Sequence, residues 1–186
     1  METRPSIVIP ITDILQERSK EQLTKLLESI EPYREKYSMV LGLFDGTDEF
    51  FTSHFKELFP WLHCIENLGK PLNFTRNSNV GLRFVYENIK SGCFLVNQDC
   101  ILPPVFHENL KAMTMYDLST PMSIEEGAEA KIEGLICATP VENTRFAFYC
   151  PWISHKCMEK IGFLDGYFRK TYSDTKRQET SSSRYR

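Results

Sequence analysis

The sequence predicts an α/β fold with a mainly parallel central sheet and helices on both of its faces. Two observations lead to this prediction: short apolar runs alternate with stretches of helical periodicity, and the 186 residues suit one domain of ordinary size. Parallel strands joined by helices form right-handed crossovers that cover both faces of a sheet. We expect one domain over residues 1–175 and a polar, frayed tail over 176–186.

Four apolar runs in the first half of the chain predict buried strands. The first run, Ile7 to Ile11, is followed by leucine and isoleucine side chains at helical spacing up to Ile30, with Ser19 as the expected N-cap. The next strands are expected over Met39 to Phe44, Leu62 to Ile65 and Cys93 to Val96, with helices between them over 51–59 and 73–89.

The pattern is weaker beyond Pro104, and it favours a mixed second half. Short strands are expected over Tyr116 to Ser119, Leu135 to Ala138 and Phe146 to Tyr149. The segment Cys157 to Ile161 is expected to close a helix before Gly162.

Composition and charge exclude several classes of protein. No apolar stretch approaches the roughly 20 residues of a membrane span, and the N-terminal apolar run is too short for a signal peptide, so we expect a cytoplasmic protein. The net charge of −3 provides no broad positive field for nucleic acid. The six cysteines form no Cys-x-x-Cys pair. Cys150, His155 and Cys157 could form a metal half-site, but buried thiols are the commoner arrangement.

Polar side chains follow each of the four predicted strands in the first half. Ligands of parallel sheets bind at the carboxyl ends of the strands, which meet at one edge. We therefore expect a binding site at that edge. The residues at these strand ends are Thr12, Asp13, Asp45, Asn67, Asn97 and Asp99.

Five segments, in order along the chain, resemble motifs of inverting family-2 glycosyltransferases, whose catalytic domain has the Rossmann-like GT-A fold. The resemblance runs from about Ser6 to Asp174. It implies transfer of a sugar from a nucleoside-diphosphate donor to a hydroxyl acceptor with inversion. The segments are Ser6-Ile7-Val8-Ile9-Pro10, Leu43-Phe44-Asp45-Gly46-Thr47-Asp48, Asn79-Val80-Gly81-Leu82, Phe94-Leu95-Val96-Asn97-Gln98-Asp99, and Ile161-Gly162-Phe163-Leu164-Asp165-Gly166-Tyr167-Phe168 with Asp174 downstream.

The resemblance implies a nucleotide-sugar site at the strand ends. Asp45 would accept hydrogen bonds from the base, although a helix cap is the alternative, for which Asp48 is better placed. Lys70 and Arg76 would meet phosphate near a helix N-terminus, or are solvated surface charges. The further residues expected at this site are Pro10, Ile11, Thr12, Asn79, Asn97, Gln98 and Trp152.

Two of these residues have alternatives that the sequence leaves open. Asn79 could instead pack or cap within its helix. Trp152 would be a stacking platform for a sugar ring, whereas a half-buried core position is the commoner arrangement for tryptophan.

The resemblance also implies a divalent cation, Mn²⁺ or Mg²⁺, held by Asp99. The cation would neutralise the charge that develops on the leaving diphosphate, and diphosphate oxygens and waters would complete its coordination. Asn97 stands where the family has its first aspartate, which lowers the charge offered to the metal. A simple turn after the strand is the alternative for both residues.

Asp174 is the expected general base, which removes the proton of the attacking acceptor hydroxyl. Ser173 stands where the family often has glutamate. Asp165 is the competing base, or it fixes the loop before the acceptor site, beside glycines that allow unusual backbone angles. The alternative function is a GT-A-like module that binds nucleotide sugar without turnover. A dinucleotide-binding protein is disfavoured because no Gly-x-Gly-x-x-Gly follows the first strand.

Overall fold

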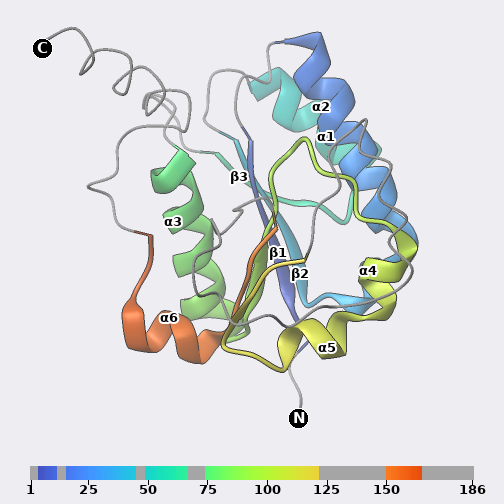
Figure 1. The fold of residues 1–186 in the computed structure, drawn as a ribbon. Helices are drawn as coiled ribbons and strands as arrows, with labels where there is room; N and C mark the ends of the chain where they lie inside the picture. Colours follow the sequence, from blue (N-terminus) through green and yellow to red (C-terminus); the bar gives the residue numbers. More distant parts are fainter. Residues whose placement is uncertain (1–3, 12–15, 45–48, 67–73, 122–149, 165–186) are drawn as a thin grey trace, which may run out of the picture.

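A six-stranded sheet with strand order β3-β2-β1-β4-β6-β5 forms the centre of the molecule. The computed structural model describes residues 4–11, 16–44, 49–66, 74–121 and 150–164. Helices α1, α2, α4 and α5 lie on one side of the sheet and helices α3 and α6 on the other (Figure 1). The predicted α/β fold with a mainly parallel sheet is therefore confirmed.

The parallel part of the sheet consists of four strands. Strand β1 (Ser6–Ile11) lies between β2 (Met39–Phe44) and β4 (Cys93–Leu95), and β3 (His63–Glu66) pairs with β2. Every residue of β1 is buried, because the strand is central and both of its faces are covered. This burial is the reason that β1 appears in the sequence as a continuous apolar run.

The helices of the first half follow the predicted order. Helix α1 (Glu17–Ile30) continues into the 3₁₀ helix η1 (Glu31–Lys36), α2 (Glu49–Leu58) follows β2, and α3 (Phe74–Phe84) continues into a π-helical turn, η2 (Val85–Ile89). The expected N-cap is wrong: the N–H of Ser19 donates to the carbonyl of Gln16 at 3.0 Å, so α1 begins earlier. Ser19 lies in the first turn of the helix.

The second half is built from short elements. They are α4 (Pro104–Glu108), α5 (Leu110–Thr114), β5 (Leu118–Ser119), β6 (Trp152–Ile153) and α6 (His155–Ile161). Strand β6 runs antiparallel to both β4 and β5, which makes the sheet mixed at this edge. The expected strand near Ser119 is confirmed in shortened form, whereas α4, α5 and β6 were not predicted. The strands expected over 135–138 and 146–149, and the tail, lie outside the described residues.

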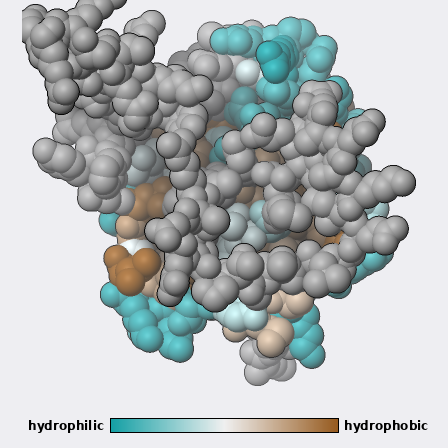
Figure 2. Space-filling view, in the orientation of Figure 1, coloured by the Kyte–Doolittle hydropathy of each residue, from teal (hydrophilic) through white to brown (hydrophobic). Residues whose placement is uncertain are grey.

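Helix α3 packs closely on the sheet because Gly81 faces it. A Cβ atom at Gly81 would lie 2.5 Å from Val8 Cγ1 and 2.7 Å from Leu43 Cδ1. The glycine therefore allows a close approach of helix to strand. Figure 2 shows hydrophilic side chains over the ends of α1 and α2 at the top of the view. In the described part of the chain, no helix has the length and apolar character to cross a membrane.

Candidate functional site

The strand order creates a topological switch point between β1 and β4. From β1 the chain passes through α1 to β2, on one side of β1, and from β3 it returns through α3 to β4, on the other side. Helices α1 and α3 therefore lie on opposite faces of the sheet (Figure 1). Connections that diverge in this way leave a crevice at the carboxyl ends of the two strands, where α/β sheets bind their ligands.

The described end of β1 is a buried part of the sheet. Pro10 and Ile11 pair in register with Leu43 and Phe44 of β2, and Ile11 is only 1% exposed. The structure thus places Pro10 and Ile11 at the expected edge, as part of the rigid sheet.

A turn follows β4 at the same edge of the sheet. The N–H of Val96 donates to the Val8 carbonyl at 2.8 Å, which extends the pairing with β1 beyond the end of β4. The N–H of Cys100 then donates to the Asn97 carbonyl at 3.1 Å, so that Asn97 to Cys100 form a turn containing Gln98 and Asp99. Asp99 is exposed at this turn and Gln98 is half-buried. The turn expected as the alternative for Asn97 and Asp99 is therefore present.

Two buried side-chain oxygens lack a hydrogen-bond partner among the residues that the structure describes: Oδ1 of Asn97, in this turn, and Oγ of Ser78, on α3. Strand alternation places the Asn97 side chain on the same face of the sheet as Leu95, which packs in the cluster on the α3 side. Ser78 is fully buried and lies one helical turn before Gly81, on the face of α3 that meets the sheet.

Leaving such an atom unsatisfied costs about 1–3 kcal/mol. A polar ligand that supplies the missing hydrogen bonds would remove this cost. Sequence reasoning missed Ser78; the available signal was a serine three residues before Gly81, at a helix position that should be apolar.

The thiol beside Asp99 is not reactive. Burial, with a smaller contribution from the negative charge of Asp99, raises the pKa of Cys100 to about 11. A thiol with so high a pKa stays protonated near neutral pH and is a poor nucleophile or metal ligand.

The suggested metal half-site is not formed. Cys150 belongs to the core cluster on the α1 side of the sheet, and Cys157 belongs to the cluster on the α3 side. The imidazole of His155 stacks on Tyr86, with ring centroids 4.5 Å apart. Within the described ranges, no group of three or more His, Cys, Asp or Glu side chains could hold a metal ion.

Trp152 lies in the core, which corrects the expectation of a sugar-stacking platform. Its side chain is 5% exposed, its ring packs on Phe94 with centroids 5.1 Å apart, and its Nε1 donates to the Tyr116 carbonyl at 2.9 Å. Gly92 makes room for the indole, because a Cβ atom there would lie 2.3 Å from Trp152 Cη2. The polar atom is satisfied and the ring is buried, so Trp152 serves packing.

Asn79 and Arg76 both lie on α3, in different surroundings. The side-chain amide of Asn79 makes two hydrogen bonds to the backbone of Leu164, at 2.7 and 2.8 Å. Arg76 lies in the first turn of the helix and is half-buried. The other expected site residues lie outside the described residues. These are Thr12, Asp45, Lys70, Asp165 and Asp174.

No model of a protein family matches this sequence, and no curated protein matches it. One similar solved structure is that of 4-diphosphocytidyl-2C-methyl-D-erythritol synthase, with 14% identity, a TM-score of 0.45, and coverage of 61% of this chain and 53% of that one. Another is S. aureus TarS 1-349, with 15% identity, a TM-score of 0.46, and coverage of 68% and 39% respectively. The chain thus spans about half the length of the synthase and about two fifths of the length of the TarS structure. Structural similarities this weak do not indicate a function. The proposal below is therefore based on the site alone.

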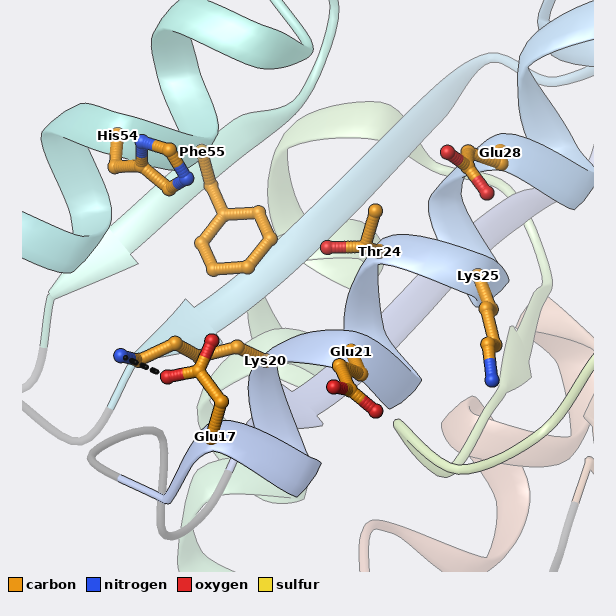
Figure 3. Close-up of a pocket in the computed structure, with 8 residues that line it drawn as sticks. All are labelled: Glu17, Lys20, Glu21, Thr24, Lys25, Glu28, His54 and Phe55. Atoms are coloured by element: carbon orange, nitrogen blue, oxygen red, sulfur yellow. Dashed lines mark hydrogen bonds and ion pairs between the residues drawn. The ribbon is translucent and has the colours of Figure 1, made fainter.

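A separate shallow groove of about 340 Å³ lies between α1 and α2 (Figure 3). Its charged side chains include both signs, and Lys20 Nζ lies 2.9 Å from Glu17 Oε2 and 4.2 Å from the centroid of the Phe51 ring. Ion pairs at the surface contribute little stability. We assign this groove no binding chemistry.

Proposed function

We propose that this chain binds a nucleoside-diphosphate sugar at the crevice between β1 and β4 and transfers the sugar to a hydroxyl acceptor with inversion. The observation that carries the proposal is two buried side-chain oxygens that have no hydrogen-bond partner among the described residues: Asn97 Oδ1, which follows β4 at the switch point, and Ser78 Oγ, on the face of α3 that meets the sheet. An amide oxygen only accepts hydrogen bonds, whereas a hydroxyl can also donate one. A nucleotide sugar offers matching groups, because its sugar hydroxyls donate and its phosphate oxygens accept.

The remaining donor contacts follow the resemblance to family-2 glycosyltransferases. Asp45 would bind the base, supported by Pro10, Ile11 and Thr12. Lys70 and Arg76 would bind phosphate, assisted by the positive end of the α3 dipole. The position of Arg76 in the first turn of α3 supports this arrangement.

We propose Mn²⁺ or Mg²⁺ as the cofactor, with Asp99 as its protein ligand. A single exposed carboxylate fits a cation held mainly by diphosphate oxygens and water, and does not fit a cage built entirely from protein. When bound, the cation would stabilise the negative charge on the leaving diphosphate.

For the transfer step we propose Asp174 as the general base, with Asp165 as the competing candidate. The carboxylate would take the proton of the acceptor hydroxyl while the hydroxyl oxygen bonds to the anomeric carbon. The bond from that carbon to the diphosphate oxygen breaks at the same time, and the diphosphate leaves with the electron pair. Attack from the face opposite the leaving group inverts the anomeric configuration.

A thermal-shift screen with UDP-glucose, GDP-mannose, ADP-glucose and dTDP-glucose, each with and without Mn²⁺, tests the donor site. A ligand at 100 times its Kd stabilises the folded state by about 2.7 kcal/mol, so binding raises the melting temperature. We expect Asp99→Ala to abolish the part of the shift that depends on Mn²⁺. The control Asp117→Ala, which removes another exposed aspartate, should leave the shift intact. A protein that binds no sugar nucleotide in the panel contradicts the proposal.

The second candidate function is a nucleotide-sugar-binding module without turnover. It is favoured by Asn97, a neutral side chain at the position where the family has an aspartate. Release of nucleoside diphosphate from a donor that binds distinguishes the two functions. Asp174→Ala should then spare donor binding and remove this release if the protein is an enzyme.

A further inference from the structure

Asn97 turns one polar atom of its side chain to the interior and the other to the surface. Its Oδ1 is buried and has no hydrogen-bond partner among the described residues. Its Nδ2 also makes no hydrogen bond within the described part of the chain, but this atom, unlike Oδ1, is not buried. Because Asn97 as a whole is half-buried, Nδ2 is its accessible polar atom. An amide nitrogen donates two hydrogen bonds and accepts none.

Two backbone hydrogen bonds hold the chain directly before Asn97. The Leu95 N–H donates to the Pro151 carbonyl at 2.9 Å, and the Val96 N–H donates to the Val8 carbonyl at 2.8 Å. The strand is thus bound to its neighbours on both sides where it ends. The side chain of Asn97 therefore starts from a fixed position at the carboxyl edge of the sheet, where α/β folds bind their ligands.

The exposed carboxylate of Asp99 lies in the same turn, two residues after Asn97. A carboxylate only accepts hydrogen bonds, and its negative charge attracts the partly positive N–H groups of an amide. The reverse orientation of the Asn97 amide would turn Oδ1, a second acceptor, toward the surface that carries this charge. The turn therefore offers one group for each sign of charge: Asp99 for a cation and Asn97 Nδ2 for an anion.

We propose that Asn97 binds the diphosphate of the donor through Nδ2, as a hydrogen-bond donor, and is not a ligand of the metal ion. The inference rests on the proposed function, in which a cation on Asp99 is shared with diphosphate oxygens. Those oxygens then lie against the turn that carries Nδ2. They only accept hydrogen bonds, which an amide nitrogen supplies. Oδ1 is left for a sugar hydroxyl.

The neutral side chain at this position affects how strongly donor binding depends on metal. An aspartate here would repel the diphosphate whenever no cation is bound, since like charges repel each other at short range. Asn97 attracts the diphosphate instead, so a part of the affinity for the donor should persist without Mn²⁺. Only the remaining part should depend on the cation at Asp99.

The first test is calorimetry in EDTA and then in Mn²⁺, with UDP, GDP, ADP or dTDP, whichever the parent protein binds most tightly. We expect the parent to bind in EDTA, and Asn97→Ala to bind about tenfold more weakly, the effect of losing one hydrogen bond to a charged acceptor. The loss should be similar in Mn²⁺, because Nδ2 contacts phosphate and not the cation. Asn88→Ala is the matched control, because Asn88 is exposed and its Nδ2 donates to the Phe84 carbonyl at 3.0 Å.

Asn97→Asp keeps the size of the side chain and replaces the hydrogen-bond donor by a negative charge. In EDTA this variant should bind the nucleoside diphosphate more weakly than Asn97→Ala, because the two negative charges repel each other. In Mn²⁺ it should regain most of this loss, since a second carboxylate helps to hold the cation. A variant that had only lost folded structure would bind equally weakly under both conditions.

The second test uses the parent protein, labelled with ¹⁵N, and requires no variant to fold. In EDTA, the same nucleoside diphosphate should shift the side-chain NH₂ signals of Asn97 more than those of Asn88, because a phosphate oxygen accepts from Nδ2. The corresponding nucleoside, which has no phosphate, should not produce this shift.

The outcomes separate the inference from the proposed function. Equal affinities of the parent and Asn97→Ala in EDTA overturn the inference, and so does a loss in Asn97→Ala that is confined to Mn²⁺, which would make Oδ1 a metal ligand. Asn97→Asp that binds as tightly as the parent in EDTA, or Asn97 signals that do not move, overturn it as well. A parent that binds nucleotides only with Mn²⁺ overturns the inference and leaves the proposed function standing. A parent that binds none under either condition overturns both.

Discussion

The two halves of the sheet are stabilised in different ways. Strands β1 to β4 are held by apolar side chains on both faces, and the whole of β1 is buried. Strands β5 and β6 have two residues each and depend on individual side chains. Ser154, which follows β6, is one example. Its N–H donates to the Asp117 carbonyl at 2.9 Å, and its Oγ donates to Asp117 Oδ1 at 3.1 Å. Single substitutions should therefore lower the free energy of unfolding more in the second half than in the first.

The largest expected effect comes from Trp152→Ala. The substitution removes a buried indole and its hydrogen bond to Tyr116, and it leaves a cavity beside Phe94. Truncations of this kind cost about 3–5 kcal/mol. The free energy of unfolding, measured by urea denaturation, should fall by that amount.

Trp61→Ala is the matched control for this prediction. Trp61 is only partly buried, and its Nε1 donates to the exposed Glu31 at 3.2 Å. We expect a clearly smaller loss of stability than for Trp152→Ala. Equal losses for the two tryptophans would contradict the assignment of Trp152 to the core.

Gly92→Ala is expected to cost about 1–3 kcal/mol, the usual range for overpacking. The new Cβ would lie 2.3 Å from Trp152 Cη2 and 2.9 Å from the Ile153 carbonyl oxygen, so backbone as well as side chain would have to move. Gly42→Ala is the comparison in the first half, where the new atom would lie 3.2 Å from the ends of two side chains. The melting temperature of Gly42→Ala should stay closer to that of the parent than the melting temperature of Gly92→Ala. A larger loss for Gly42→Ala would contradict the greater sensitivity of the second half.

Sequence reasoning predicted the first half well for a physical reason. A parallel strand covered on both faces must be apolar along its whole length, so Ile7 to Ile11 is visible in the sequence. A two-residue strand such as Trp152–Ile153 has no periodicity to detect, because it pairs only where β4 has already formed. Long-range pairing therefore decides the second half.

The positions of a few expected site residues in the fold followed from the topology, whereas the contacts of their side chains did not. The strand-end rule predicted that Asn97 and Asp99 follow the carboxyl end of β4, and the structure has them there, because this position depends on topology alone. Residue type alone could not show whether Trp152 is a core residue or a stacking platform for a sugar. It also could not show whether Asn79 contacts the donor or binds the backbone of another segment. These roles depend on partners far away in the chain, Tyr116 and Leu164.

His107 joins the two halves and should make their contact sensitive to pH. Its Nε2 faces the Leu102 carbonyl at 3.2 Å, so this nitrogen carries the proton and Nδ1 accepts from the Tyr37 hydroxyl at 2.6 Å. The ring also stacks on Tyr33, at 4.2 Å between centroids. Burial lowers the pKa of His107 below its ordinary 6.5, and the nearby positive charge of Lys36 lowers it further.

The unfolded chain therefore binds a proton at His107 more readily than the folded protein. Its contribution to stability is fully present above about pH 6.5 and is lost as the pH falls toward the lowered pKa, by at most about 1.4 kcal/mol for each pH unit. Chemical denaturation between pH 7.5 and pH 5 measures this slope. His107→Gln should flatten it, whereas His63→Gln, which removes an exposed imidazole, serves as the control. Parallel curves for the parent and His107→Gln would rule out this role.

The smallest expected effect comes from a comparison of two serines: one that caps a helix in the structure and one that the sequence only suggested as a cap. Ser154 precedes α6, and its Oγ accepts from the Cys157 N–H at 2.9 Å, so Ser154→Ala should cost about 1 kcal/mol. Ser19 lies inside the first turn of α1, whose N-cap is Gln16, so Ser19→Ala removes no cap. Alanine is the better helix former, which offsets part of any lost packing at Ser19. Urea denaturation should thus show a loss for Ser154→Ala and little change for Ser19→Ala, and the opposite order would mean that α1 begins where the sequence suggested.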